Sequence, residues 1–331
     1  MRIGQRAGAT DTGRKRRRNE DSFVVRPPLF AVADGMGGAQ AGEIASRLAT
    51  EALGDSAPAG TAEERVVGLV QGANRRVYER SAEDAAVSGM GTTITLALVE
   101  DGLVTIGHVG DSRAYLVRDG SLEQLTQDHS LVAELMRSGK LSPEEAESHP
   151  QRSVITRALG TDPDVDVDVF TLEARPGDVF LLCSDGLTSM VGDDVILGAI
   201  EASRDDLDAA ARTLIARANR GGGEDNITVV CFEIAEGEDA PAAEASPEET
   251  VRLPAVDAAA AEPDDEETLD ELDRVPAVDT MVVPPEQAAR FAARPDAPPD
   301  RLDAIGRRVL VTLAILALVL GALALLFWGL S

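Results

Sequence analysis

Short apolar runs alternate with longer amphipathic stretches over the first 236 residues of the chain. The runs are rich in Val, Ile and Leu and are bounded by Gly or Asp, which is typical of buried strands. They predict strands at residues 22–25, 29–33, 92–99, 104–109, 114–117, 179–183 and 227–234. Several of these runs are joined by turns too short to hold a crossover helix, so antiparallel pairing is expected.

Apolar residues recur with helical spacing in four other stretches, 42–53, 61–80, 192–202 and 205–219. Thr61 followed by Glu64 forms a capping box at the start of the second stretch. Ser142 and Glu145 repeat this pattern, with a proline at the first helical position. Short strand connections together with these helices favour sheets covered by helices over a doubly wound parallel sheet.

Residues 237–306 have a different composition, dominated by Ala, Pro, Asp and Glu. This segment holds 19 acidic and 5 basic residues, few aromatic residues and no sustained periodicity. Such a segment cannot bury enough apolar surface to offset the entropy of ordering it, and its charges repel one another. We therefore expect a disordered linker after a domain that spans residues 1–236.

Residues 309–330 carry no charged side chain. A helix of this length, at about 1.5 Å per residue, spans roughly the 30 Å core of a bilayer. The pattern predicts a single transmembrane helix within a C-terminal anchor at residues 307–331. Arg301, Arg307 and Arg308 precede the run, and positive charge marks the cytoplasmic side. The expected location is therefore the cell membrane, with the large domain in the cytoplasm.

Charge and cysteine content narrow the possible functions. The chain of 331 residues has 31 Lys and Arg against 58 Asp and Glu, so a nucleic-acid-binding surface is not expected. Cys183 and Cys231 each lie within an apolar run, which indicates two buried thiols in a reducing compartment rather than a disulfide.

Acidic residues stand repeatedly at the ends of the predicted strands. Asp34 ends the apolar run in FAVADGMGGAQAG, and Asp111, Asp185 and Asp225 occupy similar junctions, as does the pair that begins with Glu20. One Asp-Gly junction is ordinarily a turn, but several suggest that these strand ends meet. Gathered carboxylates repel one another unless cations or basic groups hold them together.

Oxygen ligands with few His or Cys residues favour Mg²⁺ or Mn²⁺ over Zn²⁺. Two such ions that share a carboxylate can lower the pKa of a water molecule and hold a phosphate for in-line attack. The junctions thus indicate a two-ion site that acts on phosphate groups.

Six ordered motifs resemble the metal-dependent protein phosphatases of type 2C, most closely the bacterial, membrane-anchored members. They are Arg16-x-x-Asn19-Glu-Asp, Asp34-Gly-Met-Gly-Gly38 with Ala41-Gly-Glu43, Gly91-Thr-Thr93, Gly110-Asp-Ser-Arg113, Ser184-Asp-Gly186 and Asp225-Asn226. The resemblance covers about residues 1–235. It implies an α+β fold, a sandwich of two antiparallel sheets flanked by helices, and hydrolysis of phosphoserine and phosphothreonine in proteins.

The resemblance also implies roles for individual residues. Asp34 would bridge two Mn²⁺ or Mg²⁺ ions, and the carbonyl of Gly35 would bind the second of them. Asp185 and Asp225 would complete the site of the first ion. Glu20 would hold metal-bound water.

Three further positions follow from the same resemblance. Arg16 would bind the substrate phosphate, because a guanidinium offers paired donors to phosphate oxygens. Asp111 matches the position of a third metal in bacterial members, and Ser153 is its weaker companion. Members of this kind usually oppose transmembrane Ser/Thr kinases, so those kinases and their phosphorylated substrates are the expected partners.

The chain departs from eukaryotic members at Met36, where they carry a histidine that is a candidate general acid. Met cannot donate a proton, so metal-bound water is expected to take that role. Two alternative functions from other classes make different predictions. A catalytically weak, phosphatase-like binding module at the membrane predicts the loss of a metal carboxylate, and none is lost. Another Mg²⁺-dependent phosphotransferase would need an Asp-x-Asp nucleophile or a Gly-rich loop with Lys, and neither is present.

Overall fold

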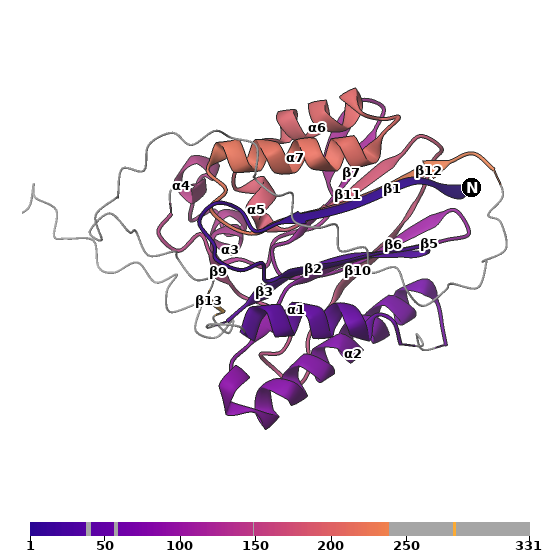
Figure 1. The fold of residues 1–331 in the computed structure, drawn as a ribbon. Coiled ribbons are helices and arrows are strands. Elements are labelled where there is room, and N and C mark those ends of the chain that lie inside the picture. Colours follow the sequence, from indigo (N-terminus) through magenta and orange to yellow (C-terminus); the bar gives the residue numbers. More distant parts are fainter. Residues whose placement is uncertain (38–40, 56–58, 148, 238–280, 283–331) are drawn as a thin grey trace, which may run out of the picture. The chain divides into compact units, whose positions relative to one another are not determined.

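Two antiparallel β-sheets lie face to face, and helices cover their outer faces, in the computed structural model (Figure 1). The structure describes residues 1–37, 41–55, 59–147, 149–237 and 281–282. Every described pairing within the two large sheets is antiparallel. The predicted α+β sandwich is therefore confirmed for this part of the chain.

The first sheet has the strand order β1-β12-β11-β7-β8. Its strands are β1 (Arg2–Asp11), β7 (Arg113–Arg118), β8 (Ser121–Gln124), β11 (Val179–Cys183) and β12 (Ile227–Ala235). Strand β12 lies between β1 and β11 and pairs along its length with the N-terminal strand β1. The two ends of the folded region are thus joined in one sheet.

The second sheet has the order β10-β6-β5-β3-β2, and a short strand β4 also pairs with β3. Its strands are β2 (Asp21–Arg26), β3 (Leu29–Met36), β4 (Gly91–Thr92), β5 (Ile94–Glu100), β6 (Leu103–Val109) and β10 (Asp168–Glu173). Each of the seven apolar runs that predicted a strand lies in one of the two sheets.

The helices belong to three groups. Helices α1 (Ala41–Ala52) and α2 (Ala62–Glu83) cover the second sheet, and α6 (Asp193–Ala202) and α7 (Leu207–Gly221) cover the first (Figure 1). The remaining elements are η1 (Ala85–Val87), α3 (Leu131–Arg137), α4 (Pro143–Glu147) and α5 (Asp185–Thr188). The predicted capping boxes are present: the Thr61 side chain accepts from the Glu64 N–H and Glu64 accepts from the Thr61 N–H, and Ser142 and Glu145 exchange the same bonds.

Stacked aromatic rings join the two sheets at their centre. Phe30 of β3 stacks on Phe232 of β12 with ring centroids 4.1 Å apart, and Phe180 of β11 lies 5.0 Å from Phe232 on its own sheet. All three side chains are fully buried. Offset stacking of this kind adds to the hydrophobic stabilisation from burying the rings.

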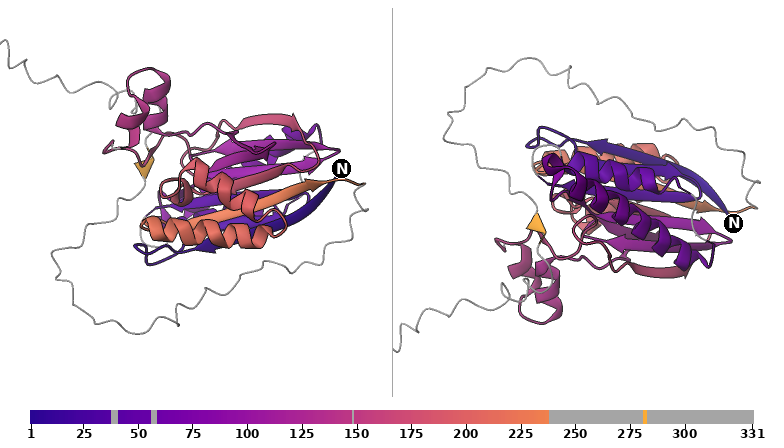
Figure 2. Two further views of the ribbon diagram at one scale, coloured as in Figure 1. Left: turned by 90° about the horizontal axis from the view of Figure 1, so that it is seen from above. Right: turned by 90° about the horizontal axis from the view of Figure 1, so that it is seen from below.

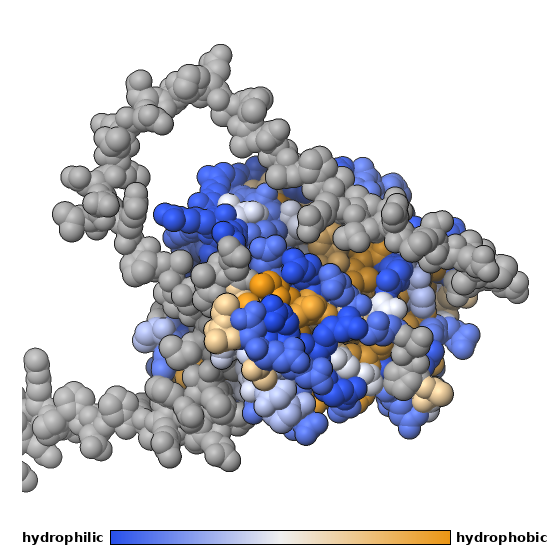
Figure 3. Space-filling model, turned by 60° about the horizontal axis from the view of Figure 1, so that its bottom comes forward, coloured by the Kyte–Doolittle hydropathy of each residue, from blue (hydrophilic) through white to orange (hydrophobic). Residues whose placement is uncertain are grey.

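A separate apolar layer lies beneath each pair of helices. Val66, Val70, Ala73 and Val77 of α2 are fully buried against the second sheet, as the period of 3.6 residues predicts. Figure 3 turns the side of the molecule that carries α1 and α2 toward the viewer, and hydrophilic side chains cover much of it. The fold is therefore a four-layer arrangement with cores on both sides of each sheet.

Residues 125–147 and 149–167, between β8 and β10, form a flap that holds α3, α4 and the two-residue strand β9 (Val154–Ile155). Strand β13 (Met281–Val282) pairs parallel with β9. These two residues come from the acidic segment, so the expectation of a linker without structure is wrong for them. Figure 2 shows β13 beside the flap from both directions.

The other predictions for the C-terminal region fall on residues outside those described. Within the described ranges, no helix combines the length and the apolar composition needed to cross a bilayer. The proposed anchor at 307–331, the run at 309–330 and the rest of the acidic segment lie outside those ranges.

The stacked rings supply a first testable prediction. Phe232→Ala should lower the free energy of unfolding by about 3–5 kcal/mol, because it leaves a cavity between the sheets. Leu103→Ala is the control, since Leu103 is 38% exposed and its truncation should change stability little. Urea unfolding measures both, and equal losses for the two variants would contradict the central role of the stack.

Candidate functional site

The acidic residues singled out in the sequence meet at one end of the two sheets. Asp34 lies near the end of β3, Asp185 begins α5 directly after β11, and Asp225 precedes β12. Asp111 lies in the turn between β6 and β7. In an antiparallel sheet the end of one strand lies beside the start of its neighbour, so these positions lie at the same end of the two sheets. Asp34 and Asp225 line one cavity, together with Arg16, Glu20, Gly35, Met36 and Gly37.

The register of β2 and β3 adds a carboxylate that sequence reasoning did not assign to the site. Asp21 is the direct cross-strand partner of Asp34. One of its carboxylate oxygens accepts hydrogen bonds from Ser184 Oγ at 2.9 Å and Thr228 Oγ1 at 2.6 Å. Its other oxygen, Oδ1, is buried and has no hydrogen-bond partner among the described residues. A buried acceptor of this kind is costly unless another group meets it.

Burial and mutual repulsion change the acidity of these groups. Burial raises the pKa of Asp34 well above its usual value, and the negative charges of Asp21, Asp185, Asp225 and Asp111 raise it further. Burial likewise raises the pKa of Asp21 to about 7 and that of Asp185 to about 6. The carboxylates are thus close enough to oppose one another's ionisation.

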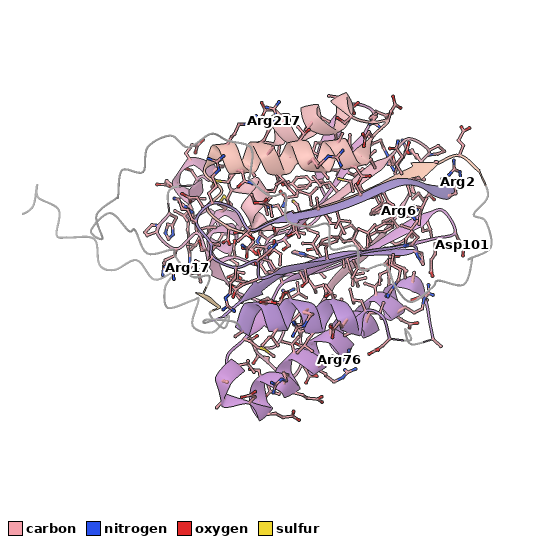
Figure 4. The ribbon with its side chains drawn as sticks, in the orientation of Figure 1. Arg2, Arg6, Arg17, Arg76, Asp101 and Arg217 are labelled. Atoms are coloured by element: carbon pink, nitrogen blue, oxygen red, sulfur yellow. The ribbon has the colours of Figure 1, made fainter. Side chains whose placement is uncertain are left out.

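Arg16 is a basic residue that the fold directs into this cluster. Its Nη2 donates to Asp225 Oδ2 at 2.8 Å, and both side chains are mostly buried. Arg17, labelled in Figure 4, is exposed. The structure therefore places Arg16 beside Asp225 and leaves Arg17 exposed, and the binding of a phosphate by Arg16 stays a prediction.

Asn226 holds the loop that carries Arg16 and Glu20. Its Oδ1 accepts from the Glu20 N–H at 2.8 Å, and its Nδ2 donates to the carbonyls of Thr12 and Arg18, each at 2.9 Å. The Glu20 carbonyl in turn accepts from the Gly35 N–H at 3.2 Å. This network fixes the N-terminal loop against β3 and β12.

Gly35 is required by packing. A Cβ there would collide with the carbonyl oxygens of Gly42 and Glu20, so the start of α1 could not approach β3. Gly42 faces the same constraint, because its Cβ would lie 2.8 Å from the Gly35 carbonyl. The missing side chain of Gly35 therefore makes room for protein backbone. The role of its carbonyl as a ligand stays a prediction.

Asp111 is buried and is held by a network that the sequence did not reveal. Burial, then the negative charges of Asp185 and Asp128, raises the pKa of Asp111 well above its usual value. The backbone of the preceding Gly110 donates to His129 Nδ1 at 3.0 Å and accepts from the His129 N–H at 2.7 Å. The flap thereby contacts the turn that carries Asp111.

The rings of two histidines stack beside this turn. The rings of His108 and His129 have centroids 4.7 Å apart, and both side chains are buried. Burial lowers the pKa of His108 to about 3 and also lowers that of His129. Both rings are therefore neutral at physiological pH and serve as hydrogen-bonding elements of the core.

Ser153 lies in the turn before β9 and is partly exposed. Among the described residues, no hydrogen bond joins it to Asp111, so its proposed role beside that residue stays a prediction. Glu20 lines the same cavity as Asp34, and its predicted role in holding metal-bound water stays a prediction.

The donor set fits hard divalent cations. The converging groups are carboxylate oxygens, they are buried, and they repel one another, so a cation that neutralised them would relieve a large electrostatic penalty. Within the described part of the chain, no three acidic or imidazole side chains already surround a single point. Asp225 is turned to Arg16 and Asp21 to two hydroxyl groups, which accounts for this arrangement.

Residues 14–220 match the sequence family described as Protein phosphatase 2C. The serine/threonine phosphatase stp of Listeria welshimeri is 42% identical over 236 residues, which are 68% of this chain and 93% of that protein. The serine/threonine protein phosphatase PstP of Mycobacterium tuberculosis is 43% identical over 231 residues, which are 69% of this chain but only 44% of PstP.

Solved structures agree with these sequence matches. The crystal structure of PstP from M. tuberculosis has a TM-score of 0.67 at 41% identity and covers 71% of this chain and 100% of its own. A structure of the PstP catalytic domain in complex with two manganese ions has a TM-score of 0.66 at 39% identity, covering 71% of this chain and 99% of its own.

The tight contact at Gly35 supplies a second prediction. Gly35→Ala should lower the free energy of unfolding by about 2 kcal/mol, because the new methyl group overlaps backbone atoms that cannot move away. Gly198→Ala in α6 is the matched control. A Cβ there meets nothing within 4 Å, so the same change should leave stability unchanged or raise it. Thermal or urea unfolding of both variants tests this, and an unaffected Gly35→Ala would disprove the packing argument.

Proposed function

The chain belongs to the protein phosphatase 2C family, and we propose that it hydrolyses phosphoserine and phosphothreonine in proteins with the aid of two Mn²⁺ or Mg²⁺ ions. The observation that carries this proposal is the cluster of buried, mutually repelling carboxylates from both sheets, with an arginine lining the same cavity. The relatives named as serine/threonine phosphatases, and the two manganese ions in a PstP structure, support it.

The residues that would hold the ions are Asp34, Asp185 and Asp225, with the Gly35 carbonyl. When bound, divalent ions of this kind activate water and offset the charge that develops on a transferring phosphoryl group. Asp34 is central because each of the other carboxylates acts on its ionisation. Asp21 belongs to the same cluster, and hydrogen bonds from Ser184 and Thr228 hold its carboxylate.

The chain's own contribution is orientation and charge. Arg16 presents a planar guanidinium at the cavity, and such a group can bind two oxygens of a phosphate at once. Asp225 and the fold around Asn226 hold the Arg16 loop in place. Met36 lines the cavity but has no proton to give, so a water molecule must protonate the leaving alkoxide.

We also propose that the enzyme works at the cell membrane and opposes Ser/Thr kinases located there. Support comes from sequence alone: the uncharged run at 309–330 and the arginines before it.

Asp111 and Ser153 are proposed as a third metal site. The alternative, a catalytically weak binding module, differs from the main proposal in having no metal-dependent turnover.

Asp34→Asn in the full chain separates catalysis from folding. It should reduce phosphopeptide hydrolysis in Mn²⁺ by several orders of magnitude, because position 34 would no longer offer the ions a carboxylate. In EDTA, the variant should unfold at the same temperature as the wild type or higher, since a buried like charge is gone. Mn²⁺ should raise the melting temperature of the wild type but not of the variant.

The exposed Asp119 in the β7–β8 turn provides the control, and Asp119→Asn should change neither activity nor stability. Full activity of the wild type in EDTA would refute metal dependence. A wild type that binds Mn²⁺ but shows no turnover would favour the binding module.

Arg16 gives an independent prediction about substrate binding. Arg16→Ala should raise KM for a phosphopeptide by about tenfold, the value of a charge-assisted hydrogen bond, and should lower kcat less. Arg17→Ala, one position away and exposed, should leave KM unchanged. Steady-state kinetics on both variants checks the assignment, which fails if Arg17→Ala shows the larger effect.

A further inference from the structure

The flap carries a strand edge beside the site, and a segment far along the chain occupies it. Strand β9 has two edges: the backbone of Ser130 pairs with Ile155 on one of them, and β13 pairs with β9 in parallel register. Met281 lies opposite Val154, and Val282 lies opposite Ile155. Figure 2 shows β13 against the flap in both views.

Strand β9 is connected to the wall of the catalytic cavity. Ile155 is buried in a small cluster with Met36 and Ala158, and Met36 lines the cavity next to Gly35. Arg152, just before β9, donates to Glu224 Oε2 at 3.4 Å, and Glu224 adjoins Asp225 in sequence. A segment that pairs with β9 is therefore attached to a strand that packs against the wall of this cavity.

The sequence of residues 281–282 suits a strand. Met281-Val-Val283 is an apolar, β-branched run within a segment otherwise dominated by Ala, Pro and acidic residues. Pro284 and Pro285 follow shortly after and have no backbone N–H to donate to a ladder. An exposed strand edge is a general site for adding an extended peptide.

We propose that residues 281–282 dock on the β9 edge of the same molecule and compete there with extended segments of protein substrates. The inference rests on the proposed phosphatase function for its kinetic part only. The occupant is the chain's own segment because the register in the structure is intramolecular. The acidic sequence that precedes Met281 carries negative charge, as a phosphorylated substrate does. Arg152 and Arg157 flank β9 in sequence.

Disulfide trapping tests the docking without reference to catalysis. Adjacent strands lie about 4.8 Å apart, within the Cα separation that a disulfide spans. In the full chain, Val154→Cys with Met281→Cys should oxidise at least tenfold faster than Val154→Cys with Val278→Cys. In urea, the two pairs should oxidise at similar rates, because only tether length then matters. Cys183 and Cys231 are buried, and burial raises the pKa of both thiols, so they should not interfere.

Equal native rates for the two cysteine pairs would overturn the docking. Disulfide-linked dimers whose yield rises with protein concentration would overturn the intramolecular assignment and would make a second copy the occupant. A wild type without phosphatase activity would remove the proposed function, yet the trapping rates would still report the docking. The two failures are therefore distinguishable.

Proline substitution tests the competition. Met281→Pro with Val282→Pro removes both backbone donors of β13. This variant should lower KM for a phosphopeptide at least threefold and leave hydrolysis of p-nitrophenyl phosphate unchanged, because that compound has no backbone to pair with β9. Ala255→Pro with Val256→Pro is the matched control in the same acidic segment and should change neither value. An unchanged KM in the β13 variant would overturn the competition.

Discussion

Repulsion among buried carboxylates is the constraint on which the rest of this structure depends. Asp34 is buried with the negative charges of four other aspartates acting on it, and burial in a medium of low dielectric makes each charge costly. The carboxylates of this cluster cannot move apart, because they are fixed at the ends of strands from two sheets. The stacked rings of Phe30 and Phe232 hold those sheets together, so hydrophobic packing opposes the repulsion at the site.

Protons and cations are alternative ways to relieve this repulsion. The pKa of Asp21 is raised to about 7 and that of Asp185 to about 6 in the folded state. The folded chain therefore holds protons that the unfolded chain releases. This contribution to stability is fully present below about pH 4 and is lost as the pH rises through 6 to 7. A divalent cation held by these carboxylates would compete with protons, so metal affinity should be linked to pH in the opposite sense.

Local sequence patterns were enough to predict most strands and the carboxylates at their ends. Apolar runs that end in Asp-Gly identified the strands and the positions of Asp34 and Asp185. Strand β1 was not predicted, because its residues are mostly half-exposed and interrupted by Gly4 and Gly8. Asp21 was seen only as a neighbour of Glu20. Its contacts with Ser184 and Thr228 join residues more than 160 positions apart, and no local pattern carries that information.

The flap is connected to the carboxylate cluster through His129. His129 binds the backbone of Gly110 on one side, while its Nε2 lies 3.1 Å from Asp168 Oδ2 and 3.0 Å from Arg157 Nη1 on the other. Since Gly110 precedes Asp111, a shift of the flap would act on the turn that carries a cluster carboxylate. A neutral imidazole suits this position, because a second positive charge beside Arg157 would be repelled. The same flap carries the β9 edge, so whatever pairs with that edge acts on a segment already hydrogen-bonded to the site.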